Sequence, residues 1–302
     1  MGRRVSVFSA VILIGLSAAL VTHAGAAEQA KPIEGARKET PARVVPLAAP
    51  GSSGAAAQTV KRNALRVATR HTSVECKVKG PAYEGRAPLR AVRRALLQKR
   101  PVRVMALGAV STAGATATSS PRASYPVRLE KDLESTIEGL RVEMFTRGLP
   151  GEVAEEAGER IKAEVAAIRP DLVVWQAGTN DALARIDAKT FGDLLRESLS
   201  WLASHKIDVV LIDPQYVERL AKDTRYTSIV NEVATVASEK RVLLVNRYDA
   251  MADLARQHPG SSYLSNDRFH LNDLGYRCMA EYAARAIVAG VLQADAENGA
   301  TH

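Results

Sequence analysis

The feature that most constrains the fold of this chain is an alternation of short apolar segments with amphipathic ones, beginning at Val102. The apolar segments, rich in Val, Ile and Leu, predict strands at 102–107, 141–146, 172–176, 207–212 and 242–245. Between and after them, helical spacing of apolar residues predicts helices at 123–138, 154–168, 188–205, 224–238, 248–256 and 273–291. Uniformly apolar strands separated by helices are typical of a parallel sheet covered on both faces. We therefore predict a three-layer α/β/α domain with a five-stranded parallel sheet over residues 102–293.

The N-terminus has the pattern of an export signal. Arg3 and Arg4 precede an apolar run at 5–21, and the small residues of Ala24-Gly25-Ala26 follow. An uncleaved membrane anchor is the alternative, although the run is short for a span of about 20 residues. We predict a signal peptide at 1–26 and a periplasmic or secreted protein.

The region between this signal and the predicted domain has two parts. Residues 27–60 are rich in Pro, Gly, Ser and Ala and predict a flexible linker. Residues 61–101 form a basic extension with one predicted helix, 88–99, and a short tail is expected at 294–302. The chain has a net charge of +8, but residues 61–103 hold thirteen Lys and Arg against two Glu. This block could bind an anionic envelope polymer or membrane surface; the alternative is a solvated helix face with surface loops, and nucleic acid is not an expected partner of an exported protein.

Two cysteines, Cys76 and Cys278, lie on either side of most of the predicted domain. In an oxidising compartment such a pair tends to form a disulfide. We predict this bridge between the N-terminal extension and the last helix; two buried free thiols are the alternative.

Candidate functional residues follow the strands, where a parallel sheet gathers its functional groups. A small-residue loop at 108–114 follows the first strand and contains Ser111. Gly151 follows the second strand and could present its backbone N–H group to an oxyanion, and Asn180 follows the third and could donate from its side chain. Each residue taken alone is also explained as a turn or helix-cap residue.

The pair Asp267 and His270 precedes the last predicted helix. A carboxylate three residues before an imidazole can fix the tautomer of the ring and raise its basicity. The histidines of the chain do not have the spacing of a metal site, so no metal is expected.

The order of these four segments resembles the SGNH/GDSL hydrolase superfamily, and the stretches 124–129 and 213–216 look like an exported bacterial subgroup of it. The resemblance covers residues 102–293 and implies a flavodoxin-like SGNH hydrolase fold. It also implies that His270 is the general base, Asp267 its orienting carboxylate, and Gly151 and Asn180 the oxyanion donors. The implied reaction is attack on an ester carbonyl, formation of an acyl-enzyme and its hydrolysis, and it implies no metal or organic cofactor.

The first segment departs from the family pattern Gly-Asp-Ser-x-Thr. Aligned on Gly108 and Thr112, the chain has Val110 in the place of the nucleophile. Three interpretations are open: Ser111 is the nucleophile in a shifted loop, Thr112 acts instead, or the site binds an acylated ligand without catalysis. The second segment departs too, with Thr146 where Asn is frequent.

Three functional hypotheses follow from these patterns. The first is an exported serine ester hydrolase acting on an acylated envelope carbohydrate or a small ester, and the second is a non-catalytic binding protein that uses the same crevice. The third makes the basic segment at 61–103 the functional part, docked on an anionic surface, with the domain as a scaffold.

Overall fold

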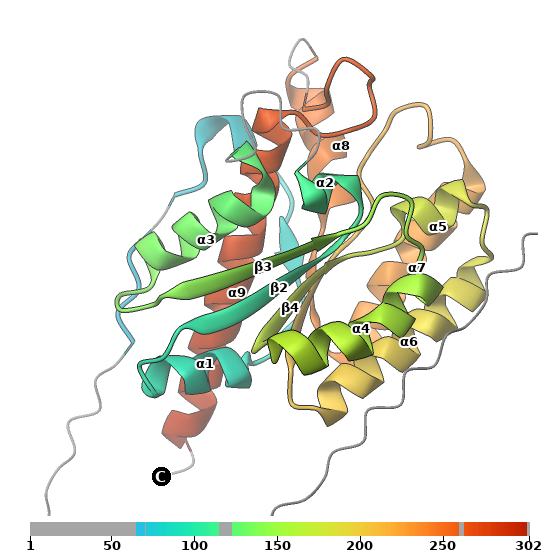
Figure 1. The fold of residues 1–302 in the computed structure, drawn as a ribbon. Helices are drawn as coiled ribbons and strands as arrows, with labels where there is room; N and C mark the ends of the chain where they lie inside the picture. Colours follow the sequence, from blue (N-terminus) through green and yellow to red (C-terminus); the bar gives the residue numbers. More distant parts are fainter. Residues whose placement is uncertain (1–64, 70, 115–122, 260–262, 301–302) are drawn as a thin grey trace, which may run out of the picture. The chain divides into compact units, whose positions relative to one another are not determined.

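The computed structural model describes residues 65–69, 71–114, 123–259 and 263–300 (Figure 1). The predicted signal peptide (1–26) and linker (27–60) lie outside the described residues. Residues 61–302 form one compact unit, and everything below concerns that unit. No described helix is both long enough and apolar enough to cross a membrane.

A six-stranded sheet forms the middle layer, with the strand order β1-β6-β5-β4-β2-β3. Five strands are parallel, as predicted, and their bounds are β2 Val102–Gly108, β3 Val142–Gly148, β4 Leu172–Gln176, β5 Asp208–Ile212 and β6 Leu243–Val245. The sixth, β1 (Tyr83–Glu84), pairs antiparallel with β6 at one edge. The predicted fold class is confirmed but the predicted strand count was one too low, because two residues between glycines and prolines carry no strand periodicity.

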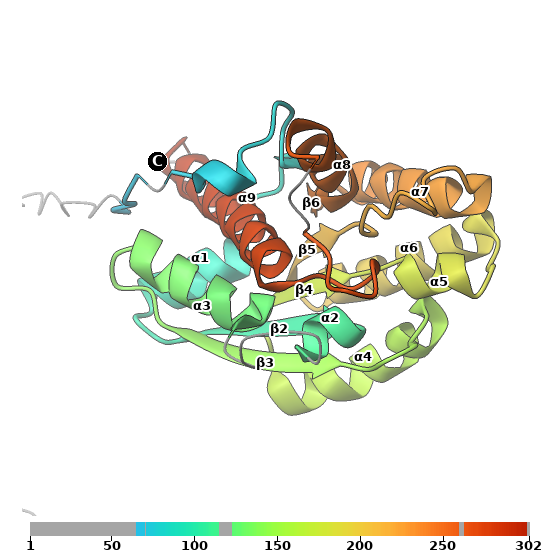
Figure 2. The same ribbon diagram turned by 90° about the horizontal axis from the view of Figure 1, so that it is seen from above.

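Helices cover both faces of the sheet (Figure 2). One face packs against α1 (Arg90–Leu97), α3 (Tyr125–Thr136), α8 (Arg247–Gln257) and α9 (Asp273–Ala300). The other packs against α4 (Ala154–Ile168), α6 (Ala188–Ser204) and α7 (Thr224–Lys240). Two short helices, α2 (Val110–Ala113) and α5 (Thr179–Leu183), begin directly behind β2 and β4. The last helix continues to Ala300, so most of the predicted tail is helical.

The basic extension packs against the rest of the compact unit. Val67 bridges to Ile137 at the end of α3, and β1 extends the sheet. A 3-10 helix, η1 (Val74–Cys76), precedes β1 and brings Cys76 to α9. Cys76 and Cys278 form the predicted disulfide, 202 residues apart in the sequence. This bridge ties the start of the described chain to the first turns of its last helix.

Candidate active site at the carboxyl edge of the sheet

The direction of chain winding reverses at β2. From β2 the chain moves outward to β3, then returns to the other side of β2 for β4, β5 and β6. In open α/β sheets ligands bind in the crevice at such a switch point, outside the carboxyl ends of the strands. The loops after β2, β3 and β4 meet there around a small cavity of about 20 Å³, which Gly108, Glu152 and Asn180 help to line.

The turn after β2 is tight, and it decides which side chain faces the crevice. At Gly108 φ is +153°, and an added Cβ would lie 2.6 Å from Thr112 Oγ1. Ala109 is the N-cap of α2, so Val110 is its first helical residue. The half-buried Val110 therefore heads α2, in the place where the family resemblance expects the nucleophile.

Ser111 is directed into the core instead. Its side chain is only 4% exposed. With the Gln176 amide oriented to satisfy its neighbours, Gln176 Oε1 accepts from Ser111 Oγ at 3.2 Å and from Arg247 Nη1 at 2.7 Å. Thr112 is fully buried, and its Oγ1 lies 3.4 Å from the hydroxyl of Tyr125. Both candidate hydroxyls are thus engaged below the crevice.

A buried cation underlies this network. Arg247, at the start of α8, is 1% exposed and donates to the backbone oxygen of Asp213 behind β5. Burial lowers the pKa of Arg247 and raises the pKa of the Asp213 carboxyl to about 7. Sequence reasoning missed Arg247 and Gln176. The sequence did offer one signal for Arg247: Asp213 comes at the end of one predicted strand, and Arg247 comes just after the next strand.

The predicted pair Asp267 and His270 is in contact. Asp267 Oδ2 lies 2.6 Å from His270 Nδ1, and its Oδ1 accepts from Ser265 Oγ and from the backbone N–H groups of Phe269 and His270. The hydrogen bond from Ser265, followed by that from His270, holds the pKa of Asp267 well below its usual range. An ionised carboxylate at Nδ1 favours the tautomer with the proton on that nitrogen, which leaves Nε2 free as a base. The His270 side chain is 27% exposed, so solvent and ligands can reach the ring.

The loop that carries His270 is attached to the segment behind β5. Gln215 Nε2 donates to the backbone oxygen of Phe269 at 2.8 Å, and the Arg219 guanidinium lies over the Phe269 ring. Because β5 neighbours β4, this attachment keeps the loop at the same edge as the turn that carries Asn180.

The two predicted oxyanion donors come from neighbouring loops. Asn180 Nδ2 donates to the backbone oxygen of Glu152 at 2.8 Å, which joins the loops behind β4 and β3. A side-chain amide has two N–H donors, so the second remains for a ligand. Gly151 is exposed and adopts φ +81°, a backbone conformation that favours glycine. Asn180 thus contacts Glu152, the residue that follows Gly151 in the chain.

The structure does not join all the predicted catalytic residues. In the part of the chain that is described, no hydrogen bond links His270 to Ser111, whose hydroxyl is used by Gln176. No cluster of three potential metal-ligating side chains occurs among the described residues either. The roles assigned to Ser111, His270, Asp267, Gly151 and Asn180 stay predictions.

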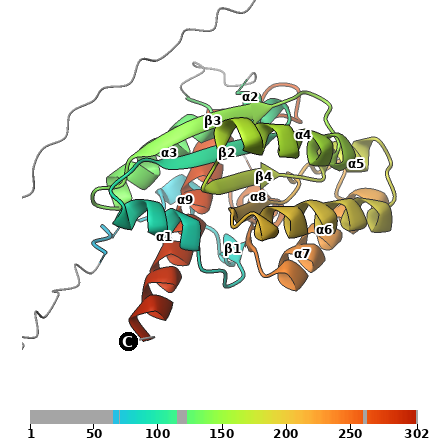
Figure 3. The same ribbon diagram turned by 60° about the horizontal axis from the view of Figure 1, so that its bottom comes forward.

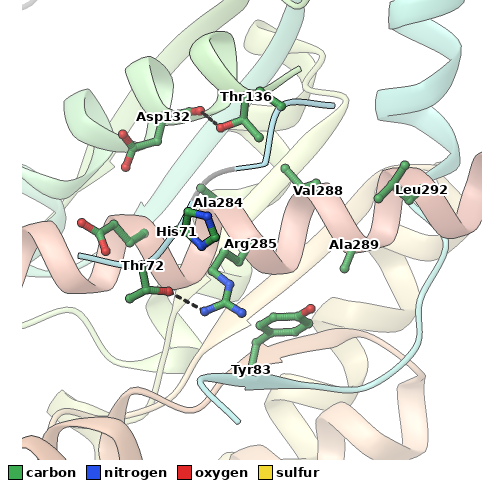
Figure 4. Close-up of a pocket in the computed structure, with 12 residues that line it drawn as sticks. His71, Thr72, Tyr83, Asp132, Thr136, Ala284, Arg285, Val288, Ala289 and Leu292 are labelled. Atoms are coloured by element: carbon green, nitrogen blue, oxygen red, sulfur yellow. Dashed lines mark hydrogen bonds between the residues drawn. The ribbon is translucent and has the colours of Figure 1, made fainter. Parts of the chain in front are cut away.

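A second pocket, of about 240 Å³, lies between the basic extension, α3 and α9 (Figure 4). Its polar side chains contact one another and their surroundings. Arg285 donates to Thr72, Thr136 donates to the backbone of Asp132, and Glu281 accepts from Ser73. The bonds of Arg285 and Glu281 attach the extension to α9.

The basic extension is partly neutralised by carboxylates. Arg90 pairs with Glu297 and Arg93 with Asp295, both on α9. Arg100 binds Asp171 through two hydrogen bonds, of 2.6 and 2.7 Å. The predicted binding of an anionic surface by this segment is untested and stays a prediction.

The sequence profile of the Non-GDSL lipase-like family matches residues 75–293. The chain belongs to this family. No curated protein sequence matches this family member significantly.

Solved structures with the same fold include esterases. An acetyl xylan esterase, AlAXEase, is 22% identical with a TM-score of 0.54, over 62% of this chain and 100% of its own. A lipase/acylhydrolase from Enterococcus faecalis is 26% identical with a TM-score of 0.52, and the match covers 62% of this chain and 95% of that one. A two-domain esterase active on acetylated mannans is 14% identical with a TM-score of 0.59, and the match covers 72% of this chain and 58% of that one. The predicted SGNH/GDSL hydrolase fold is confirmed.

Proposed function

We propose that this member of the Non-GDSL lipase-like family is an exported ester hydrolase with His270 as its general base. The observation that carries the proposal is the 2.6 Å contact between Asp267 and the His270 ring, at the carboxyl edge of the sheet. A carboxylate that orients an accessible imidazole serves to remove a proton from a reacting group.

In the proposed reaction His270 Nε2 takes the proton of the attacking hydroxyl, whose oxygen bonds to the ester carbonyl carbon. The negative charge on the carbonyl oxygen is stabilised by the Gly151 backbone N–H and the second N–H of Asn180. Collapse of the tetrahedral intermediate breaks the bond to the alcohol, which receives the proton from His270. Water, activated by the same ring, then hydrolyses the acyl-enzyme.

We propose Ser111 as the attacking residue, and the geometry sets a clear requirement for it. The Ser111 Oγ has to leave Gln176 and turn from the core toward His270, because it is 4% exposed where it lies. A substrate that displaces Val110 from the head of α2 would drive this change, since Val110 and Ser111 share one turn of helix.

The substrate we propose is a short-chain ester of a carbohydrate. The cavity of about 20 Å³ beside Asn180 has room for little more than one methyl group or one water molecule. The methyl group of an acetyl ester fits such a space, and a long acyl chain does not. Relatives in fold act on acetylated polysaccharides, which supports the same choice.

The test compares the wild type with His270→Ala, Ser111→Ala and Val110→Ser on p-nitrophenyl acetate and on acetylated xylan. Labelling with a fluorophosphonate, followed by peptide mass spectrometry, identifies the nucleophile. We expect both Ala variants to lose at least a hundredfold in rate, and an adduct on Ser111. Activity that survives His270→Ala would overturn the proposal.

A second candidate function, ligand binding without catalysis, is favoured by Val110 at the head of α2 and by the buried Ser111. It predicts an inactive wild type without any adduct. It also predicts that Val110→Ser creates esterase activity, because that change places a hydroxyl at the family position of the nucleophile. Lower activity in Val110→Ser than in the wild type would contradict it.

Export is tested with a reporter. Residues 1–60 are fused to an alkaline phosphatase that is active only outside the cytoplasm. We expect phosphatase activity and a fusion shortened at about residue 26. An inactive fusion would contradict export, and an active fusion of full length would indicate an uncleaved anchor.

A further inference from the structure

A buried ion pair lies next to Gly151 in the chain. The Glu152 side chain is only 2% exposed. Arg160, in the second turn of α4, binds both of its carboxylate oxygens: Nε donates to Oε1 at 2.6 Å, and Nη2 donates to Oε2 at 2.7 Å. A bidentate pair fixes the direction of a carboxylate as well as its distance. Glu152 is therefore held in one orientation.

Arg160 contacts both ends of the turn between β3 and α4. Besides binding Glu152, its Nη2 donates to the backbone oxygen of Arg147, the second-last residue of β3, at 3.3 Å. Its Nη1 donates to Glu164, which also accepts from Arg147 Nε. In Figure 3 α4 runs back from this turn, and α5 lies near the beginning of α4. A single side chain of α4 thus spans the turn that contains Gly151.

Two hydrogen bonds join this turn to the loop that carries Asn180. Asn180 Nδ2 donates to the backbone oxygen of Glu152 at 2.8 Å, and the backbone N–H of Ala154 donates to Asp181 Oδ1 at 2.8 Å. Glu152 therefore makes two contacts, with its carboxylate on Arg160 and its carbonyl oxygen on Asn180. Where Arg160 holds Glu152 decides where the Asn180 amide lies.

Gly151 needs such support from its neighbours. It is exposed, its φ is +81°, and no described atom would lie within 4 Å of a Cβ added to it. Glycine is the residue with the greatest backbone freedom, and at this position no packing restricts it. The bonds of Arg160 on either side of Gly151 restrict the turn instead.

We propose that the Arg160–Glu152 pair positions the two oxyanion donors, the Gly151 N–H and the Asn180 amide. This inference rests on the proposed function, and both residues of the pair are positioning residues that do not touch the substrate. A donor stabilises an oxyanion at about 2.7–3.1 Å, and a displacement of about 1 Å can cost roughly a hundredfold in rate. Stability alone is a poor explanation for the pair, because the cost of desolvating two buried charges offsets much of their attraction.

The experiment compares kcat and KM of the wild type and Arg160→Lys on p-nitrophenyl acetate and p-nitrophenyl thionoacetate. Lysine keeps the charge but cannot bind both carboxylate oxygens as the guanidinium does. The matched control is Arg100→Lys, because Arg100 also binds a carboxylate bidentately, that of Asp171 at 2.6 and 2.7 Å, but before β2 at the amino edge of the sheet. A second variant, Arg160→Met with Glu152→Met, replaces the pair by apolar side chains and leaves no buried charge unpaired. Circular dichroism gives the folded fraction, to which each rate is normalised.

We expect Arg160→Lys to lower kcat on the acetate by about tenfold to a hundredfold with KM little changed, because the lost interaction is made in the transition state. A thiono sulfur accepts hydrogen bonds weakly, so the ratio of kcat on the acetate to kcat on the thionoacetate should fall as well. The double Met variant should show the same two changes, and Arg100→Lys neither of them.

Two kinds of failure are distinguished by these measurements. Wild-type kcat in either folded variant of the pair, or equal losses in Arg160→Lys and Arg100→Lys, would overturn this inference alone. A wild type without esterase activity would overturn the proposed function, and this inference with it.

Discussion

At the scale of single residues, one position in a helix decides the chemistry of this site. Val110 and Ser111 are consecutive residues of α2, yet Val110 is half-buried and Ser111 is buried against Gln176. Neighbouring side chains on a helix point about 100° apart, so a hydroxyl one residue along is in a different environment. The sequence identified Ser111 as a candidate but did not indicate that Gln176, itself bound by Arg247, holds its hydroxyl.

The Asp267 carboxylate should be essential for catalysis in the proposed enzyme. Asp267→Asn keeps the size of the side chain but removes the charge that fixes the His270 tautomer. We expect the rate of hydrolysis of p-nitrophenyl acetate to fall by about 10²–10⁴-fold. Asp193→Asn, an exposed change on α6, is the matched control. Equal rates for Asp267→Asn and Asp193→Asn would show that the carboxylate has no catalytic role.

Arg247 should matter for stability, because its guanidinium is the buried donor to Gln176 and to the Asp213 backbone. Arg247→Met fills a similar volume but removes the donor to the Asp213 backbone oxygen and leaves Gln176 Oε1 with Ser111 alone. We expect the free energy of unfolding to fall by about 3 kcal/mol in urea titrations. The exposed change Arg225→Met should have a small effect. A stable Arg247→Met protein would mean that solvent or a neighbouring donor replaces the guanidinium.

At the scale of elements, the sequence predicted most of the fold because strands and helices are set by local patterns. The predicted strand at 172–176 coincides with β4, and 102–107 falls one residue short of β2. Periodicity failed for α5 and β1, whose lengths of five and two residues show no repeat. The prediction that the 267–270 loop lies at the same edge of the sheet as Asn180 came from the family resemblance, since spacing along the chain does not reveal it.

The Cys76–Cys278 bridge should stabilise the compact unit strongly, because it closes a loop of 202 residues. Such a long loop loses much conformational entropy in the unfolded chain when it is cross-linked. We expect the double change Cys76→Ser and Cys278→Ser to lower the free energy of unfolding by about 2–5 kcal/mol. Reduced wild type should match the double variant. If oxidised wild type, reduced wild type and variant all unfold at the same urea concentration, the bridge does not contribute.

At the scale of the whole molecule, the two ends of the sheet carry different side chains. The carboxyl edge holds the dyad and the buried Arg247, and the amino edge presents a set of exposed cations. The predicted basic segment, 61–103, contributes Lys99 to that edge, whereas Arg141, Arg169, Lys206 and Arg241 lie in connections scattered through the chain. The distribution of charge along the sequence therefore indicated only part of this set of cations. The order of the strands in the sheet brings the others to the same edge.

Global stability should decrease between about pH 4 and pH 7 through the titration of Asp213. Burial raises the pKa of this carboxyl to about 7 in the folded chain, above its ordinary value of 3.8. The folded state therefore holds a proton that the unfolded state has released in this range, so stability is lost as the pH rises toward 7. Asp213→Asn stays neutral and keeps an oxygen to accept from Tyr248 N–H. In urea titrations, we expect the unfolding free energy of Asp213→Asn minus that of the wild type to increase from pH 4.5 to pH 8. The control Asp193→Asn should show no such trend, because the hydrogen bond from Lys189 lowers the pKa of Asp193 below this range. If wild type and Asp213→Asn have parallel pH profiles of unfolding free energy, Asp213 is ionised throughout the range and the prediction is wrong.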